Sequence, residues 1–228
     1  MAFDAVIVAG GAGSRMRSTA ADKAPTDKAP TDKAPTDKAP TDKAMLEVGG
    51  VTLLDRVLAA VAGAKQIVVV GPRRPIAQAT TPGGMVIFTT EEPPGSGPAA
   101  ALVHGLALVT APLVVLLAAD VPFASTAVPR LIDAISARVD ADAAMTVDHD
   151  GRRQPLLAIY RTEALRRAAV GDRWIGRSVR ALTGDLRVVE VATIGVEALD
   201  CDTPEQLATA RAHSAAVPHV RSMTRPAG

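Results

Sequence analysis

The sequence is poor in cysteine and in aromatic residues. Its 228 residues include one cysteine, one tryptophan, one tyrosine and three phenylalanines. Cys201, as a lone cysteine, can form neither an internal disulfide nor a multi-cysteine metal site. Because aromatic residues make up only 2% of the chain, a platform that stacks single-stranded bases is not expected.

Charge of one sign and long apolar runs are also missing. The 25 Lys and Arg balance 24 Asp and Glu, which leaves a formal net charge of +1 and argues against a nucleic-acid partner. The N-terminus lacks the basic start of a signal peptide, and no stretch approaches the ~20 apolar residues of a membrane span. Since 48% of the residues are hydrophobic, a sizeable core can form. We therefore expect a soluble, cytoplasmic, globular protein that does not act at a membrane.

A five-residue repeat is what the sequence has in excess. Asp-Lys-Ala-Pro-Thr begins at residue 22 and recurs at 27, 32 and 37, and a fifth copy opens as Asp42-Lys43-Ala44. Proline removes a backbone donor and pushes the residue before it toward extended conformations, so this period fits neither helix nor sheet. The sequence predicts a mobile, low-complexity loop over 22–41 within a domain over 1–216, followed by a flexible tail over 217–228.

Strand-like and helix-like segments alternate outside the repeat. The expected strands are 3–9, 66–70, 85–89, 113–118, 143–147, 155–160 and 186–191. The expected helices are 52–62, 98–109, 125–138, 162–169, 175–183 and 203–213. Several of the strands are near-continuous apolar runs, which is typical of a sheet covered on both faces. The pattern predicts an α/β fold with a single doubly wound, Rossmann-like, mostly parallel sheet and helices on both faces.

A glycine-rich turn follows the first expected strand. It reads Gly10-Gly11-Ala12-Gly13-Ser14-Arg15-Met16. Successive backbone N–H groups in such a turn can cradle phosphate oxygens, and Arg15 offers a charged fork that suits phosphate. The turn is not a P-loop, because no Gly-Lys-Ser/Thr follows, and Met16 replaces the third glycine of a dinucleotide fingerprint. From the residues alone, a phosphate site and a tight turn without a ligand both remain open.

Two aspartates stand where a metal could bind. Asp120 ends an apolar strand, at the edge of the sheet where α/β sites form, and could hold a Mg²⁺ that bridges nucleotide phosphates. It could also merely start a turn or cap a helix. Asp202 precedes the last expected helix and could bring a second carboxylate toward the metal or simply be the N-cap of that helix. The sequence leaves these alternatives open.

Four segments in a fixed order resemble one family. They are 9–16, 42–46, 119–122 and 202–207. Together they look like the molybdenum cofactor guanylyltransferase family, a MobA-like branch of the nucleotidyltransferases (NTP transferases), and the resemblance covers roughly residues 3–212. Two further stretches fit the family pattern: an acid-then-Gly-Pro loop over 91–98, near the base, and the segment 150–161 on the acceptor side.

The resemblance implies a Mg²⁺-dependent nucleotidyltransferase. Such an enzyme moves GMP from GTP to the phosphate of molybdopterin or Mo-molybdopterin, releases pyrophosphate, and contacts other molybdenum cofactor proteins transiently. The implied catalytic residues are Arg15, Lys43 and Asp120, and the implied metal ligands are Asp120 and Asp202. The implied nucleotide contacts are Ala9, Gly10, Gly11, Ala12, Gly13, Lys43, Glu91, Gly97 and Asp120. The implied acceptor contacts are Arg153, Pro155 and Arg177.

The basic cluster of Arg173, Arg177 and Arg180 would either meet a phosphorylated acceptor or form a solvated helix face. No general base is implied, because a phosphate acceptor is already anionic at neutral pH. His104, inside an apolar helical segment, is expected to be structural.

The repeat makes the choice of lysine ambiguous. The family lysine normally follows the Arg-Met pair within a few residues, whereas Lys23 and Lys43 follow Met16 by seven and twenty-seven residues. The downstream segment 45–50 is attached only to the last copy, so we prefer Lys43 and regard 22–41 as a tolerated insertion. A cytidylyltransferase, a guanylyltransferase for another phosphorylated acceptor, and a non-catalytic nucleotide-binding regulatory protein on this fold remain alternatives.

Overall fold

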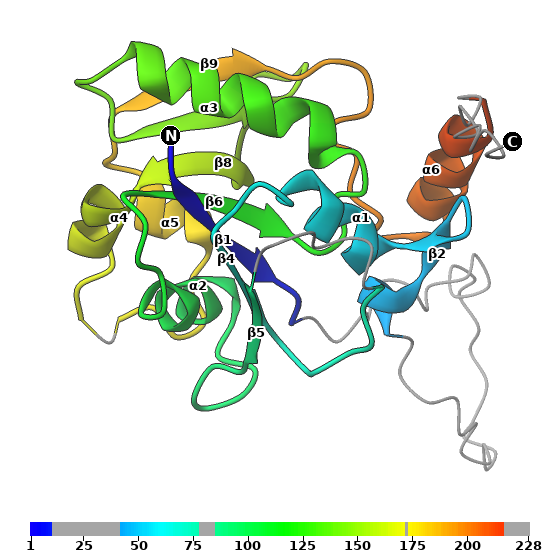
Figure 1. Cartoon of the computed structure of the whole chain (residues 1–228), viewed down its shortest axis with the longest axis horizontal. Coiled ribbons are helices and arrows are strands. Elements are labelled where there is room, and N and C mark those ends of the chain that lie inside the picture. The colour runs from blue at the N-terminus through cyan, green and yellow to red at the C-terminus, as the bar shows by residue number, and fades with distance from the viewer. Residues whose placement is uncertain (11–41, 78–84, 172, 217–228) are drawn as a thin grey trace, which may run out of the picture.

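A seven-stranded sheet forms the centre of the protein in the computed structural model, which describes residues 1–10, 42–77, 85–171 and 173–216 (Figure 1). The strands are β1 (Phe3–Val8), β4 (Gln66–Val70), β5 (Met85–Thr89), β6 (Leu113–Ala118), β7 (Ala143–Val147), β8 (Arg153–Arg161) and β9 (Val188–Ala192). Their order is β5-β4-β1-β6-β8-β7-β9, and every pair is parallel except the two that β8 makes with β6 and β7. The predicted mostly parallel sheet is confirmed.

Helices cover both faces of the sheet. One face carries α1 (Leu53–Ala60) and α3 (Ala127–Ala137), and the other carries α2 (Pro98–Leu106), α4 (Thr162–Ala168) and α5 (Val179–Thr183). The alternation along β1 shows why: Ala5 and Ile7 join the first core, whereas Val6 and Val8 join the second. Buried on both faces, β1 reads as an almost unbroken apolar run.

A third, smaller core lies beside the sheet. The last helix, α6 (Pro204–Ala216), packs on a short hairpin of β2 (Glu47–Val48) and β3 (Val51–Thr52) (Figure 1). The buried residues of this third core are Val48, Leu53, Cys201, Leu207 and Ala210. The sequence did not predict this hairpin, because strands of two residues are too short to show an alternating pattern. None of the helices in the described part of the chain is long and apolar enough to cross a membrane.

Most predicted elements agree with the structure, and one is wrong at its start. Four strands (66–70, 85–89, 113–118 and 143–147) have the bounds predicted for them. The helix expected over 175–183 begins only at Val179, because Gly176 has a φ of 70° and Ser178 caps the helix by accepting from the Ala181 amide. The predicted repeat loop 22–41 and tail 217–228 lie outside the described residues.

The carboxyl ends of the central strands meet at one edge. Val8 pairs with Val70 on one side and with Ala118 on the other. The chain continues this pairing beyond β1, since the Ala9 amide donates to the Val70 carbonyl at 2.8 Å. Gly71 follows at once, and a Cβ there would lie 2.8 Å from the Ala9 carbonyl carbon, so only glycine permits this approach. The edge is a topological switch point, where α/β folds form their sites.

Candidate active site

Asp120 lies in a turn at the carboxyl edge, two residues after β6 ends at Ala118, so it does stand in a turn as the sequence allowed. The Cys201 amide donates to the Asp120 carbonyl at 3.0 Å, which ties the loop before α6 to the end of the strand. The Cys201 side chain is fully buried in the small core beside the sheet, and this packing holds the loop in place as well. The anchor brings Asp202 and Asp120, 82 positions apart in number, to one place.

Lys43 joins these two aspartates. Its Nζ donates to Oδ2 of Asp120 and to Oδ1 of Asp202, and its side chain is only 14% exposed. Burial alone lowers the pKa of Lys43, but the charges and hydrogen bonds of the two carboxylates outweigh it and raise the pKa above the ordinary 10.5. Lys43 is therefore a charged group held at the site at neutral pH.

Asp202 is not the N-cap of α6, because Thr203 takes that place. The Gln206 amide donates to Thr203 Oγ1 at 3.3 Å, and Gln206 Oε1 accepts from the Thr203 amide at 2.9 Å. This reciprocal pair is a capping box. It satisfies the first turn of the helix without Asp202, whose carboxylate contacts Lys43 instead. Asp120 likewise caps no helix, since the next short helix, η5 (Ala124–Thr126), begins after Phe123 and has no side-chain cap.

A third carboxyl near the cluster is that of Asp200, which the sequence does not single out as a site residue. Burial, and then the charges of Asp202 and Asp120, raise its pKa above the usual value, and Gln206 Nε2 donates to its Oδ1 at 2.6 Å. Cys201 lies between Asp200 and Asp202 in the sequence. Burial, and to a smaller extent the charge of Asp120, raises the pKa of its thiol to about 11. The thiol is therefore neutral and unreactive at pH 7. The only signal for Asp200 in the sequence is its spacing of two from Asp202.

The donor set fits a hard divalent cation. Asp120 and Asp202 each direct one oxygen at a single positively charged atom, Nζ of Lys43, so both can approach one cation. Mg²⁺ is usually held by one or two protein carboxylates together with waters and substrate phosphates. Within the described ranges, no group of three or more His, Cys, Asp and Glu side chains could hold a metal. The carboxylates of Asp120 and Asp202 therefore fit the protein's share of a divalent cation site.

The start of the glycine-rich turn lies beside this cluster. Ala9 and Gly10 are described, whereas Gly11, Ala12, Gly13 and Arg15, and also Lys23, lie outside the described residues. Arg74 connects the turn to the segment of Lys43: its Nη2 donates to the Ala9 carbonyl at 3.0 Å and its Nε to Asp42 Oδ2 at 2.7 Å. The sequence alone does not single out Arg74 as a site residue. Its only signal is its place just after a strand that ends at the same edge.

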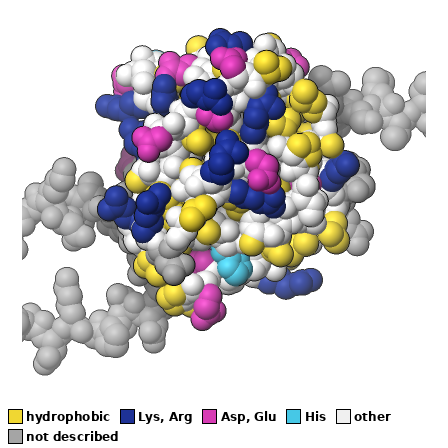
Figure 2. All heavy atoms as spheres, turned by 90° about the vertical axis from the view of Figure 1, so that its left-hand side faces the viewer, with side chains coloured by type: hydrophobic (Ala, Val, Ile, Leu, Met, Phe, Trp, Pro, Cys, Tyr) yellow, Lys and Arg dark blue, Asp and Glu magenta, His cyan; other side chains and the backbone are white. Residues whose placement is uncertain are grey.

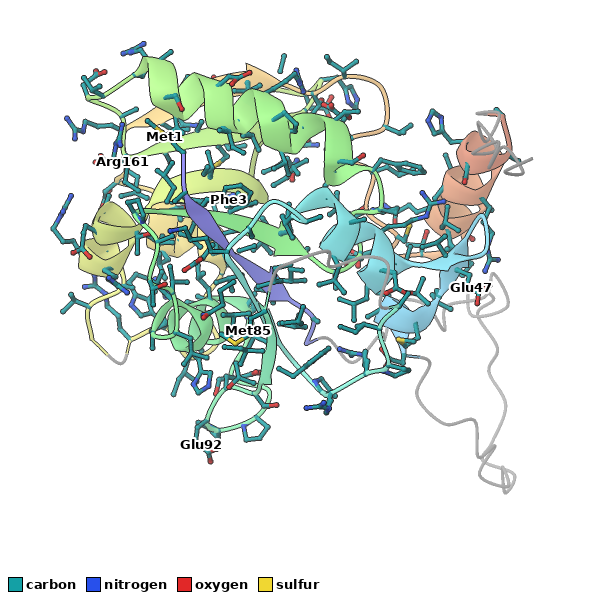
Figure 3. The ribbon with its side chains drawn as sticks, viewed as in Figure 1. Met1, Phe3, Glu47, Met85, Glu92 and Arg161 are labelled. Carbon is teal, nitrogen blue, oxygen red and sulfur yellow. The ribbon has the colours of Figure 1, made fainter. Side chains whose placement is uncertain are left out.

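The acid-then-Gly-Pro loop closes around Glu91. This side chain is only 6% exposed, its Oε1 accepts from the Gly95 amide at 3.0 Å, and the same oxygen faces Gly10. Glu92, by contrast, points outward at the tip of the loop (Figure 3). Gly97 caps α2 with a φ of 93°, which favours glycine. Glu91 and Gly97 therefore lie along one loop next to the glycine-rich turn.

His104 links α2 to the sheet, since its Nε2 lies 2.7 Å from Thr89 Oγ1. This contact agrees with the structural role expected for it.

The predicted acceptor residues divide between two depressions. Arg153, Pro155 and Arg180 line a cavity of about 370 Å³, where Arg180 Nη2 donates to the Arg153 carbonyl at 3.2 Å. Arg177 and Arg173 line a separate groove of about 820 Å³ between α4 and α5. Figure 2 shows that Lys and Arg side chains gather on this side of the molecule. The structure therefore does not bring Arg177 together with Arg153 and Pro155.

Comparison with known proteins points to one family. Residues 5–186 match the model of the MobA-like NTP transferase domain. A probable molybdenum cofactor guanylyltransferase of Natronomonas pharaonis is 30% identical over 127 residues, which cover 54% of this chain and 61% of that protein. Another, from Chloroflexus aggregans, is 35% identical over 102 residues, or 42% and 48% of the two chains. The chain thus spans about half to three-fifths of the length of these relatives.

Solved structures share the fold. The 2-C-methyl-D-erythritol 4-phosphate cytidylyltransferase of Thermus thermophilus has a TM-score of 0.63 at 21% identity, with 94% of this chain and 100% of that chain covered. Molybdopterin-guanine dinucleotide biosynthesis protein A of Archaeoglobus fulgidus has the same TM-score of 0.63 at 18% identity, again with coverage of 94% and 100%. At these identities the likeness shows a common architecture.

Proposed function

Since the chain belongs to the MobA-like NTP transferase domain family, we propose that it moves GMP from GTP to the phosphate of molybdopterin or Mo-molybdopterin. The observation that carries the proposal is the meeting of Lys43, Asp120 and Asp202 beside the first residues of the glycine-rich turn. The names of the two curated relatives support GTP and molybdopterin as substrates. We place this reaction in the cytoplasm, with transient contact to other molybdenum cofactor proteins.

The reaction needs little covalent chemistry from the protein. A phosphate oxygen of the acceptor forms a bond to the α-phosphorus of the nucleotide, and the bond from that phosphorus to pyrophosphate breaks. Because the attacking phosphate is already anionic at neutral pH, no side chain has to remove a proton. Catalysis then depends on holding the two phosphates in line and on stabilising the negative charge that develops between them.

Each charged group of the cluster has a proposed part in this reaction. Asp120 and Asp202 would hold Mg²⁺, which when bound would offset the charge of the triphosphate. Lys43 would stabilise the negative charge at the α-phosphate. Its side chain is long and flexible, so the ammonium can move from the two carboxylates to the phosphate. Gly10 would begin the phosphate-binding turn, which Arg15 would complete.

Specificity is assigned to the two ends of the site. Glu91 and Gly97 would line the base, because their loop lies beside Gly10. Arg153 and Pro155 would receive the acceptor in the cavity they share with Arg180. Arg177 stays a prediction for the acceptor, since it opens onto a different groove.

The test is a comparison of nucleotides with the purified protein. With MgCl₂ and molybdopterin present, we expect pyrophosphate release and a guanylated pterin with GTP, and no product with CTP or ATP. Product with CTP alone would replace the guanylyltransferase by a cytidylyltransferase. Nucleotide binding without pyrophosphate release would favour a non-catalytic regulatory protein.

A further inference from the structure

The guanidinium of Arg74 joins three segments at the carboxyl edge. Nε donates to Asp42 Oδ2 at 2.7 Å, Nη2 to the Ala9 carbonyl at 3.0 Å, and Nη1 to the Pro72 carbonyl at 3.3 Å. The Arg74 side chain is only 8% exposed, although Asp42 at 43% is open to solvent. A planar guanidinium that serves three acceptors in different directions is well defined in orientation.

Two of these acceptors flank the residues that matter for the proposed reaction. Ala9 precedes Gly10 of the glycine-rich turn, and Asp42 precedes Lys43. Lys43 is held from its C-terminal side as well, because it opens a single helical turn, η3 (Lys43–Met45), in which the Leu46 amide donates to the Lys43 carbonyl at 3.1 Å. Arg74 therefore supports Lys43 from its N-terminal side.

Because of the repeat, the contact between Arg74 and Asp42 selects one of several identical Asp-Lys pairs. Five consecutive copies offer an Asp-Lys pair, and the five pairs have the same two side chains. The structure shows Arg74 on the aspartate of the fifth pair. We propose that Arg74 is a positioning residue: it clamps Asp42 to the end of β1 and thereby presents Lys43, of the five lysines, to Asp120 and Asp202. The role of Lys43 in catalysis rests on the proposed function, whereas the clamp itself does not.

The adjacent arginine provides a matched control. Arg73 has the same charge and lies one residue away, but its guanidinium lies over the Phe88 ring, 5.9 Å from the centroid. A comparison of Arg74→Ala with Arg73→Ala therefore separates the clamp from the loss of a positive charge in this loop.

The first experiment measures pyrophosphate release as kcat and KM. We expect Arg74→Ala to lower kcat by about 10- to 100-fold and to change KM for GTP less than about threefold, because a displaced lysine weakens transition-state stabilisation. Arg73→Ala should match wild type. Arg74→Lys should recover only part of kcat, since one ammonium cannot reproduce the fork.

A double-mutant cycle identifies the link. Asp42→Ala should lower kcat in the same direction as Arg74→Ala, and the double variant should fall no further than Arg74→Ala alone. Equal kcat for Arg74→Ala and Arg73→Ala, or fully multiplicative effects of Asp42→Ala and Arg74→Ala, would overturn the clamp.

A second experiment needs no activity. Brief acetylation with an N-hydroxysuccinimide ester, followed by peptide mass spectrometry, reports how exposed the Lys43 amine is. We expect Arg74→Ala and Asp42→Ala to raise its labelling at least about fivefold over wild type, and Arg73→Ala to leave it unchanged. If wild type released no pyrophosphate, the proposed function would fail, but the labelling of Lys43 would still test whether Arg74 positions this lysine.

Circular dichroism checks that each variant is folded. If Arg74→Ala does not fold, Asp42→Ala, at an exposed position, provides the test. Unchanged labelling in folded Asp42→Ala would overturn the proposal.

Discussion

The two ends of the central strands, called here the amino edge and the carboxyl edge of the sheet, hold acidic side chains in different ways. At the amino edge, where Met1, Phe3 and Arg161 lie in Figure 3, Asp4 is fully buried and accepts from the backbone amides of Thr110 at 2.7 Å and Ala111 at 2.8 Å. At the carboxyl edge, Asp120 and Asp202 are 23% and 32% exposed, and both bind the side chain of one lysine.

This difference separates an edge built for stability from one suited to chemistry. Asp4 is closed off from solvent and accepts from two backbone amides and from the Thr110 hydroxyl, so it does not face a ligand in solution. A lysine side chain can turn away, which would leave two carboxylate oxygens for a cation and an ammonium for a phosphate. The comparison predicts that changes at the carboxyl edge affect turnover, whereas changes at the amino edge affect stability.

The largest effect is expected at Asp120. Asp120→Asn keeps the size of the side chain but removes the charge that would hold a divalent metal, so pyrophosphate release should fall by about 10³-fold or more. Urea unfolding should show a free energy of unfolding within about 1 kcal/mol of wild type, because the side chain is partly exposed. Turnover within about tenfold of wild type would rule out the metal role of Asp120.

The next effect distinguishes the lysines of the repeat. Lys43→Ala should reduce pyrophosphate release by about 10²-fold, since one preorganised charge at the α-phosphate is lost. Lys23→Ala, measured in the same assay, should behave as wild type. The opposite pattern, with only Lys23→Ala impaired, would move the catalytic lysine to the first copy of the repeat.

At the amino edge the prediction concerns stability. Asp4→Ala leaves the amides of Thr110 and Ala111 without their acceptor in a buried place, so the free energy of unfolding should fall by about 2–4 kcal/mol. At a temperature where the variant is still folded, its kcat should equal that of wild type. A large loss of kcat in folded Asp4→Ala would remove the distinction between the two edges.

The smallest effect is a dependence on pH at the same edge. Hydrogen bonds from Arg187 hold the pKa of Asp142 below the ordinary 3.8. A group with a depressed folded-state pKa adds stability above its unfolded pKa and loses it as the pH falls toward the folded value. Wild type should therefore be more stable than Asp142→Asn at pH 7, and the difference should shrink below about pH 4. A difference that is the same at pH 7 and pH 3, by thermal unfolding, would contradict the ion pair.

Local patterns predicted much of this fold, and tertiary contacts explain what they missed. The strands 113–118 and 143–147 are apolar runs whose bounds can be read directly, whereas Gly176 and Ser178 delay the start of the helix expected over 175–183. At Asp202 the sequence could not choose between cap and site, because Thr203 next to it can cap equally well. Arg74 escaped notice because its partners Asp42 and Ala9 lie 32 and 65 residues away. Only the folded sheet brings them together.

Nucleotide transfer is assigned to the carboxyl edge of the sheet. The most direct test of this assignment is the yield of guanylated pterin and pyrophosphate from GTP, MgCl₂ and molybdopterin. Wild type and Asp4→Asn should form the two products in equal amounts, and Asp120→Asn should form neither. Equal product from wild type and Asp120→Asn, or GTP binding by wild type with no pyrophosphate released, would contradict it.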